Sequence, residues 1–97
     1  MKVYVLEKKN LKKVEEILTK NEKTSMLSIY FRDFKTLGLE EDKVALILDG
    51  LEEYIKIADD LIKDFVEVPD ESLKNEILKR FEEEEKKARE GFGFLFS

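Results

Sequence analysis

Hydrophobic residues in the second half of the chain recur at the spacing of a long amphipathic helix. Over residues 42–66 they alternate at intervals of three and four, as one face of a helix requires. The positions of this stripe are Val44, Ile47, Leu51, Tyr54, Ala58, Leu61 and Phe65. Gly50 falls inside the segment, and we assign it to a close helix crossing. The pattern therefore predicts one long helix whose stripe, including Leu51 and Phe65, lies in the core.

Two further segments carry helical stripes that start at capping signals. Asn10 is a favourable N-cap for a helix that ends near Asn21. Val68-Pro69-Asp70 ends the long helix and starts the last one, because Pro suits a first turn and a carboxylate complements the helix dipole. The apolar stripe of the last helix consists of Leu73, Ile77, Phe81 and Ala88. Beyond Phe81 the acidic run at 82–85 is typical of a solvated helix face.

A fourth helix is predicted between these segments. Thr24 or Ser25 caps its start, and Gly38 ends it. Leu39 follows the glycine, where it can contact Phe34 in a Schellman-type stop. The stripe of this helix is Leu27, Tyr30, Phe31, Phe34 and Leu37.

The two ends of the chain have a different pattern. Residues 3–6, Val-Tyr-Val-Leu, favour a short strand because they are β-branched, aromatic or aliphatic. In residues 91–97 phenylalanine alternates with other residues, which suits a strand with one apolar face, and Gly91 suits a helix stop. The predicted fold is mainly α, a small bundle of about four helices in a single domain over 1–97. Its termini form a short two-stranded pair, or, in the alternative, the bundle is strand-free.

The apolar tail is the candidate interaction site. Exposing a large apolar side chain to water costs about 1.5 to 3 kcal/mol relative to burial, so another surface must cover the tail. We favour packing of the tail on its own domain over docking into another chain. The candidate interaction residues are Phe92, Phe94, Leu95 and Phe96.

Composition narrows the class of protein. Charged residues make up 42% of the chain, the net charge is −5, and Cys, His, Trp and Gln are absent. Enrichment in Lys and Glu with few thermolabile residues indicates a thermophilic source. The acidic balance disfavours nucleic acid and anionic membranes as partners, and no apolar run has the length of a membrane span. We therefore expect a cytoplasmic protein.

The only abundant chemical groups are carboxylates and lysines, because the absence of His and Cys removes the commonest bases, nucleophiles and metal ligands. Asp49-x-x-Glu52 followed by Glu67-x-x-Asp70 resembles the paired carboxylates with which small all-α nucleotide pyrophosphatases of the MazG type hold Mg²⁺. The chain departs from that pattern, since its first pair begins with Asp and Pro69 interrupts the second. We assign no catalytic, cofactor or metal residue from the resemblance.

The sequence thus favours a non-enzymatic interaction or structural protein of unknown role. It would act through self-association, most simply as a dimer, or through a protein partner. The alternative is a divalent-metal-dependent enzyme that uses carboxylates and is nucleotide pyrophosphatase-like. No cofactor is expected for the first class.

Overall fold

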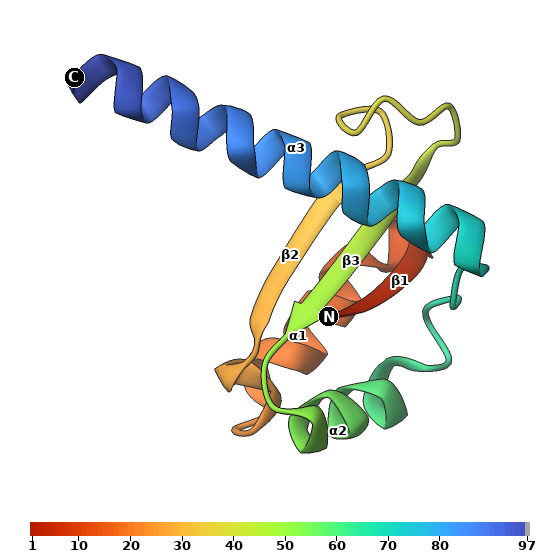
Figure 1. Ribbon diagram of the computed structural model, residues 1–97. Coiled ribbons are helices and arrows are strands. Elements are labelled where there is room, and N and C mark those ends of the chain that lie inside the picture. Colours follow the sequence, from red (N-terminus) through yellow and green to blue (C-terminus); the bar gives the residue numbers. More distant parts are fainter. Residues whose placement is uncertain (97) are drawn as a thin grey trace.

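The chain forms a three-stranded antiparallel sheet between two layers of helix (Figure 1). The computed structural model describes the backbone of residues 1–96 and the side chains of residues 1–88. The strands are β1 (Lys2–Glu7), β2 (Ser28–Asp33) and β3 (Lys43–Asp49), in the order β1-β3-β2. The architecture is α+β, so both the mainly-α four-helix bundle and its strand-free alternative are wrong.

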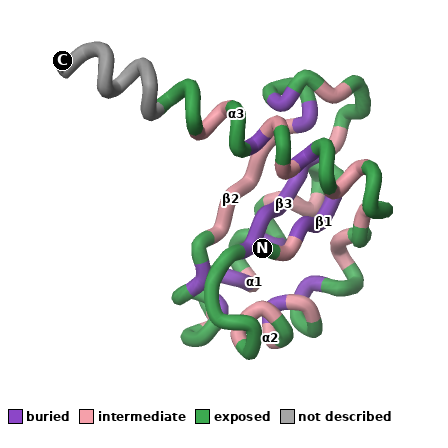
Figure 2. Tube along the Cα trace, in the orientation of Figure 1, coloured by how far each residue is buried: buried purple, intermediate pink, exposed green. Residues whose placement is uncertain are grey.

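The helices cover the two faces of the sheet. One face packs on α1 (Leu11–Lys20) and α2 (Glu52–Ile62), and the other on α3 (Glu71–Phe96). Figure 2 shows the buried positions concentrated along β1 and β3 and on the inner sides of the helices, whereas β2 is only partly buried. The sheet therefore separates two hydrophobic cores. Their fully buried members include Leu46 and Leu18 on the first face and Ile47 and Ile77 on the second.

The central strand accounts for the main difference from the predicted helix over 42–66. All five residues from Val44 to Leu48 are buried, because helices cover both faces of β3. A strand covered on both sides is apolar at every position, and such a run also satisfies helical spacing. The predicted long helix is in fact β3, a turn and α2.

Gly50 makes that turn. Its φ is +148°, a conformation that side chains disfavour, and an added Cβ would lie 2.7 Å from Leu27 Cδ2. The assignment of Gly50 to a helix crossing is therefore wrong. Leu51 follows the turn as the N-cap residue of α2 and is 59% exposed, so it is not the core residue that the stripe predicts.

The predicted helix between Thr24 and Gly38 is replaced by a short 3₁₀ turn at Thr24–Met26, strand β2 and a further turn. The local prediction at Gly38 is nevertheless confirmed. The Leu39 N–H donates to the Phe34 carbonyl at 2.8 Å, the Gly38 N–H donates to the Lys35 carbonyl at 3.0 Å, and Gly38 has φ +78°. This is the Schellman hydrogen-bond pattern, and Phe34 and Leu39 pack in the same core. It closes a single turn after β2 rather than a helix.

Elements with strong local signals match their predictions. β1 and α1 are confirmed, and the Asp70 carboxylate accepts the Leu73 N–H at 2.8 Å at the start of α3. α3 does not stop at Gly91 but is helical through Phe96, so the predicted strand is wrong there. β1 pairs with β3 from Lys2 to Glu7 and not with the C-terminal end. Ser97 lies outside the described residues.

Of the helices that the structure describes, none combines the length and hydropathy that a membrane span needs.

Candidate functional site

The candidate interaction residues Phe92, Phe94, Leu95 and Phe96 belong to the last turns of α3. Their backbone is helical, whereas their side chains lie outside the described residues. The alternation at 92, 94 and 96 therefore does not reflect a strand. That these residues form an interaction surface stays a prediction.

α3 is held to the sheet by Phe81, which is 4% exposed, and by Arg32 of β2 beside it. The Phe81 and Tyr30 ring centroids lie 5.1 Å apart, and the Arg32 guanidinium carbon lies 5.3 Å from the Phe81 centroid. Arg32 Nε contacts Glu84 Oε1 at 3.0 Å and Nη2 contacts Glu85 Oε1 at 3.1 Å. The acidic run is thus only partly the solvated face that its sequence suggests. The sequence interpretation missed this contact because the partners lie more than 50 residues apart.

The two edges of the sheet differ. The outer edge of β1 is bridged at its middle: the Val5 N–H donates to the Glu67 carbonyl at 2.8 Å, and the Glu67 N–H donates to the Val5 carbonyl at 2.7 Å. In the described part of the chain no segment pairs with the outer edge of β2. β2 is therefore an open edge strand, which presents unpaired backbone groups to another strand. The β-branched and aromatic run Ile29-Tyr30-Phe31 is consistent with a strand, but it also fits the predicted helical stripe and does not show that the strand lies at an edge.

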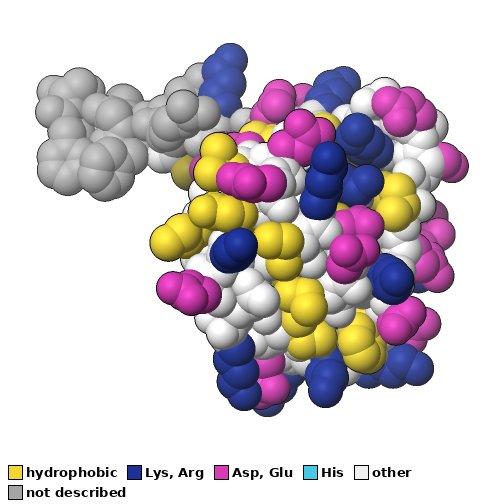
Figure 3. Space-filling view, turned by 90° about the horizontal axis from the view of Figure 1, so that it is seen from below, with side chains coloured by type: hydrophobic (Ala, Val, Ile, Leu, Met, Phe, Trp, Pro, Cys, Tyr) yellow, Lys and Arg dark blue, Asp and Glu magenta, His cyan; other side chains and the backbone are white. Residues whose placement is uncertain are grey.

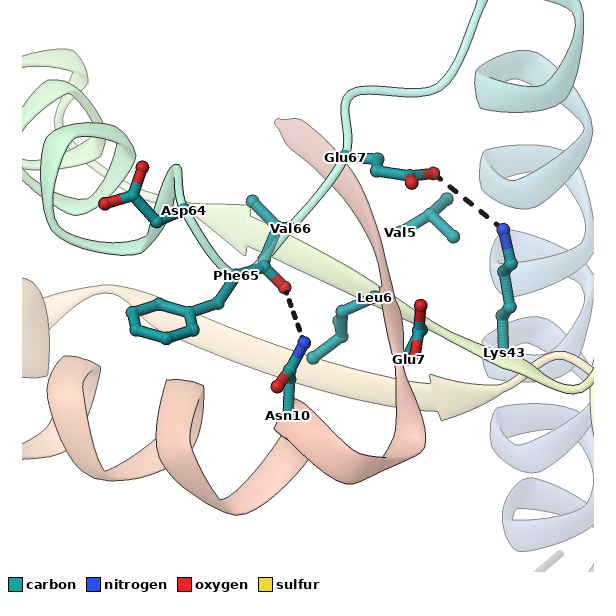
Figure 4. A pocket seen from close by; sticks show the side chains of 9 residues that line it. All are labelled: Val5, Leu6, Glu7, Asn10, Lys43, Asp64, Phe65, Val66 and Glu67. Atoms are coloured by element: carbon teal, nitrogen blue, oxygen red, sulfur yellow. Dashed lines mark hydrogen bonds and ion pairs between the residues drawn. The ribbon is translucent and has the colours of Figure 1, made fainter.

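A small pocket lies where residues 64–67 meet β1 (Figure 4). Its polar groups already bind one another, since Asn10 Nδ2 donates to the Phe65 carbonyl at 3.4 Å and Lys43 Nζ lies 3.8 Å from Glu67 Oε2. The pocket volume is about 160 Å³, below the roughly 300 to 1,000 Å³ typical of small-molecule sites. We interpret it as the joint between the β1 edge and the 64–67 segment.

The structure separates the carboxylates of the pyrophosphatase-like pattern. Asp49 ends β3, Glu52 starts α2, Glu67 pairs with β1, and Asp70 caps α3. Among the residues that the structure describes, no three His, Cys, Asp or Glu side chains are grouped closely enough to hold a metal ion. The four carboxylates of the resemblance therefore do not form one shared metal site, and the metal-enzyme alternative stays a prediction.

A polar contact between side chains joins β1 to α2. The Tyr4 ring is buried, and its hydroxyl donates to Asp59 Oδ1 at 2.8 Å. Burial raises the pKa of Tyr4 well above its ordinary value, and the hydrogen bond to Asp59 adds to the shift. The phenol therefore stays protonated at neutral pH. In this arrangement it acts as a hydrogen-bond donor that positions α2 on the sheet.

A charge cluster ties the start of the chain to the β2–β3 connection. Lys8 Nζ lies 2.6 Å from Asp42 Oδ1 and 3.2 Å from Asp33 Oδ2. The hydrogen bond from Lys8 lowers the pKa of Asp42 below its ordinary value of 3.8. The Lys35 backbone N–H and then Lys8 lower the pKa of Asp33, while Asp42 and then Asp33 raise the pKa of Lys8. All three groups are solvent-exposed, so we interpret the cluster as a fold contact that salt weakens.

This cluster predicts a pH-dependent effect of Asp42→Asn. The folded-state pKa of Asp42 is lowered, so its contribution to stability is present above the ordinary value of 3.8 and is lost as the pH falls through the folded-state value. We expect the variant to melt at a lower temperature than the wild type near neutral pH, and the difference to vanish in acid. Melting curves at low and high salt over this range check it. A difference that persists unchanged in acid would contradict the assignment.

The surface seen from below carries hydrophobic side chains interspersed with Lys, Arg, Asp and Glu side chains (Figure 3). Among the described residues, the large hydrophobic side chains with most exposure are Met26, Val68, Leu51, Met1 and Leu61. Some exposed apolar side chains are normal on protein surfaces, because more than half of a typical surface is apolar. The open β2 edge is therefore the more specific candidate for an interaction site.

Comparison of the chain with protein-family models, curated proteins and solved structures gives no match. The functional conclusion therefore comes from the geometry of this chain.

Proposed function

We propose that the chain is a non-enzymatic interaction protein that acts by self-association, most simply as a dimer. The observation that carries the proposal is the length of α3 relative to the sheet that it covers. α3 runs from Glu71 to Phe96, and Figure 1 shows it crossing the sheet and continuing past β2.

Burial along α3 supports this view. Ile77 and Phe81 are buried, and among the described side chains the last contacts with the sheet are those of Glu84 and Glu85 with Arg32. The three residues at 86–88 are exposed. The radius of gyration is 14.2 Å, against about 12.5 Å for a domain of this length. A helix of this kind offers a surface that a second chain can cover.

The sequence of the last turns of α3 adds a reason for covering it. Because the backbone of α3 continues past β2, we now propose a second chain as the cover, in place of the packing on its own domain that the sequence favours. Residues 92–96 contain three Phe and one Leu, and leaving such side chains in water is unfavourable by about 1.5 to 3 kcal/mol each. The net charge of −5 opposes association through the remaining surface. Apolar and backbone contacts are therefore the expected basis of self-association.

The mass in solution tests the proposal. Light scattering of the full chain is expected to give twice the 11.5 kDa of one chain. A chain that ends at Glu90 should associate more weakly and keep its melting temperature, because the described contacts of α3 with the sheet end at Glu85. Lys86→Ala, in the exposed part of α3, serves as the control for a change that removes no apolar residue.

Two results would count against this account. A full chain with the mass of one copy would contradict self-association. A truncated chain that melts at a clearly lower temperature and keeps its mass would assign the tail to its own domain.

A further inference from the structure

We propose that β2 pairs antiparallel with β2 of a second copy, about a two-fold axis at Tyr30, so that two three-stranded sheets become one. The inference rests on the proposed self-association and adds a second surface, the open edge of β2, to the end of α3. Two observations support it. The first is the set of β2 backbone groups that point away from β3, and the second is the hydrogen bonds that some of these groups already make.

The hydrogen bonds between β2 and β3 show which backbone groups of β2 point to the open edge. The Phe34 N–H donates to the Lys43 carbonyl across the β2–β3 pair at 2.9 Å. Because bonded and non-bonded pairs alternate in an antiparallel ladder, Arg32 with Ala45 and Tyr30 with Ile47 are also bonded pairs. The N–H and C=O groups of Ile29, Phe31 and Asp33 therefore point to the open edge.

Some of these outward groups already have partners. The Asp33 carbonyl accepts the Leu37 N–H at 3.2 Å, which agrees with its outward direction. The Phe31 carbonyl accepts Arg32 Nη1 at 3.0 Å and keeps one lone pair. Within the described residues, nothing binds the N–H and C=O of Ile29 or the N–H of Phe31. The groups left for another strand are those of two residues, Ile29 and Phe31.

A second copy of β2 matches these groups in one register. A two-fold axis at Tyr30 places Ile29 opposite Phe31 of the second copy, and each residue then donates its N–H to the carbonyl of the other. Moving the axis to Phe31 would pair Ile29 with Asp33, the last residue of β2. The Asp33 carbonyl would then have to accept a second backbone N–H beside that of Leu37, whereas the axis at Tyr30 uses no carbonyl that already accepts a backbone N–H. The groups that β2 leaves free are thus complementary to themselves, which is what a symmetric interface requires.

The side chains support the same pairing. Ile29 and Phe31 are only partly buried, on the face of the sheet that packs on α1 and α2. In the proposed register they become direct cross-strand neighbours, an apolar pair that covers the exposed part of both. An arrangement with these side chains in register across the two-fold axis therefore buries surface that the single chain leaves in water.

The rest of the fold leaves room for this pair and limits it to two copies. α3 crosses β2 near its Asp33 end (Figure 1), where Arg32 binds Glu84, so the two α3 helices lie at opposite ends of the antiparallel pair. The other edge of the sheet is bridged by Glu67 at Val5 and offers no equivalent continuous edge. The association therefore closes as a dimer rather than extending into a fibre.

Disulfide cross-linking tests the register directly, because the chain has no cysteine of its own. Across the proposed axis the two Tyr30 Cα atoms form a non-hydrogen-bonded pair about 4.5 Å apart, within the range that a disulfide spans. Tyr30→Cys is expected to give a covalent dimer under mild oxidation of the native protein. Ser28→Cys is the matched control, since its two copies would lie about 13 Å apart in this register. Equal cross-linking of both variants, or none of Tyr30→Cys, would overturn the proposal.

A proline variant tests the backbone contact. Ile29→Pro removes an outward N–H and no hydrogen bond of the β2–β3 ladder, whereas Ile29→Val keeps the donor and most of the side chain. We expect Ile29→Pro to have the mass of one copy with a cooperative melting curve, and Ile29→Val to remain dimeric. A folded, dimeric Ile29→Pro would overturn the proposal, and if this variant does not fold, the cross-linking result decides.

The outcomes also separate this inference from the proposed function. A full chain with the mass of one copy would contradict both the self-association and the pairing of β2 with a second copy. A dimeric full chain without selective cross-linking at position 30 would leave self-association in place and exclude the β2 edge as its surface.

Discussion

Replacing Leu46 by Ala is expected to lower the free energy of unfolding by about 2 to 5 kcal/mol, the usual cost of a large-to-small change in a core. Leu46 is fully buried in the central strand and packs against the core on the α1 and α2 side. Leu51→Ala is the matched control, because Leu51 is 59% exposed. We expect it to change stability by less than about 0.5 kcal/mol. Urea denaturation of both variants measures the difference.

This pair of variants separates the observed fold from a helical bundle. In a continuous helix over 42–66, Leu51 would lie on the buried stripe and Leu46 would not. The sheet reverses the two positions. A larger loss for Leu51→Ala than for Leu46→Ala would contradict the assignment of residues 43–49 to β3.

The second large effect is expected for Phe81→Ala, which removes the aromatic anchor between α3 and the sheet. Phe81 is 4% exposed, packs on the Tyr30 ring and lies beneath the Arg32 guanidinium. Truncation of a buried Phe costs about 3 to 5 kcal/mol. Glu82→Ala, at the exposed position next to it, is expected to have little effect.

Thermal and urea unfolding of the two α3 variants check this prediction. If Phe81→Ala were as stable as Glu82→Ala, α3 would not be packed on the sheet as described, and the second core would have to be reassigned.

Elements with local signals could be predicted from the sequence. The helical stripe that starts after Asn10, the β-prone residues 3–6 and the Val68-Pro69-Asp70 boundary all depend on neighbouring residues. The predicted side-chain cap at Asn10 is not formed, because its amide donates to the Phe65 carbonyl instead. The turn at Gly38 is local too, and its hydrogen bonds are those that the sequence predicts. The prediction is wrong for the element before the turn, which is the strand β2 and not a helix.

The strands β2 and β3 could not be assigned in this way because their partners are distant. β3 is apolar at every core position since helices cover both of its faces, and only the fold shows that. The role of Gly50 could not be predicted either, because a glycine inside an apparently helical pattern is compatible with both a close helix crossing and a turn. Its positive φ and the proximity of Leu27 identify the turn.

The candidate site depends even more on tertiary structure. Phe92, Phe94, Leu95 and Phe96 could be selected from their hydrophobicity alone, and their role stays a prediction. The open edge of β2 becomes apparent only when the strand order is known, because the sequence does not say which strand is central. Arg32 likewise gains its contact with Glu84 and Glu85 only when α3 crosses the sheet.

Amide hydrogen exchange along β2 tests the proposed pairing most directly. The Tyr30 and Arg32 amides point to β3 and should be protected at every protein concentration. The Ile29 and Phe31 amides point to the open edge, so we expect protection that increases with protein concentration as the second copy binds. Rapid exchange of Ile29 and Phe31 at every concentration, beside protected Tyr30 and Arg32, would contradict the pairing of β2 with a second copy.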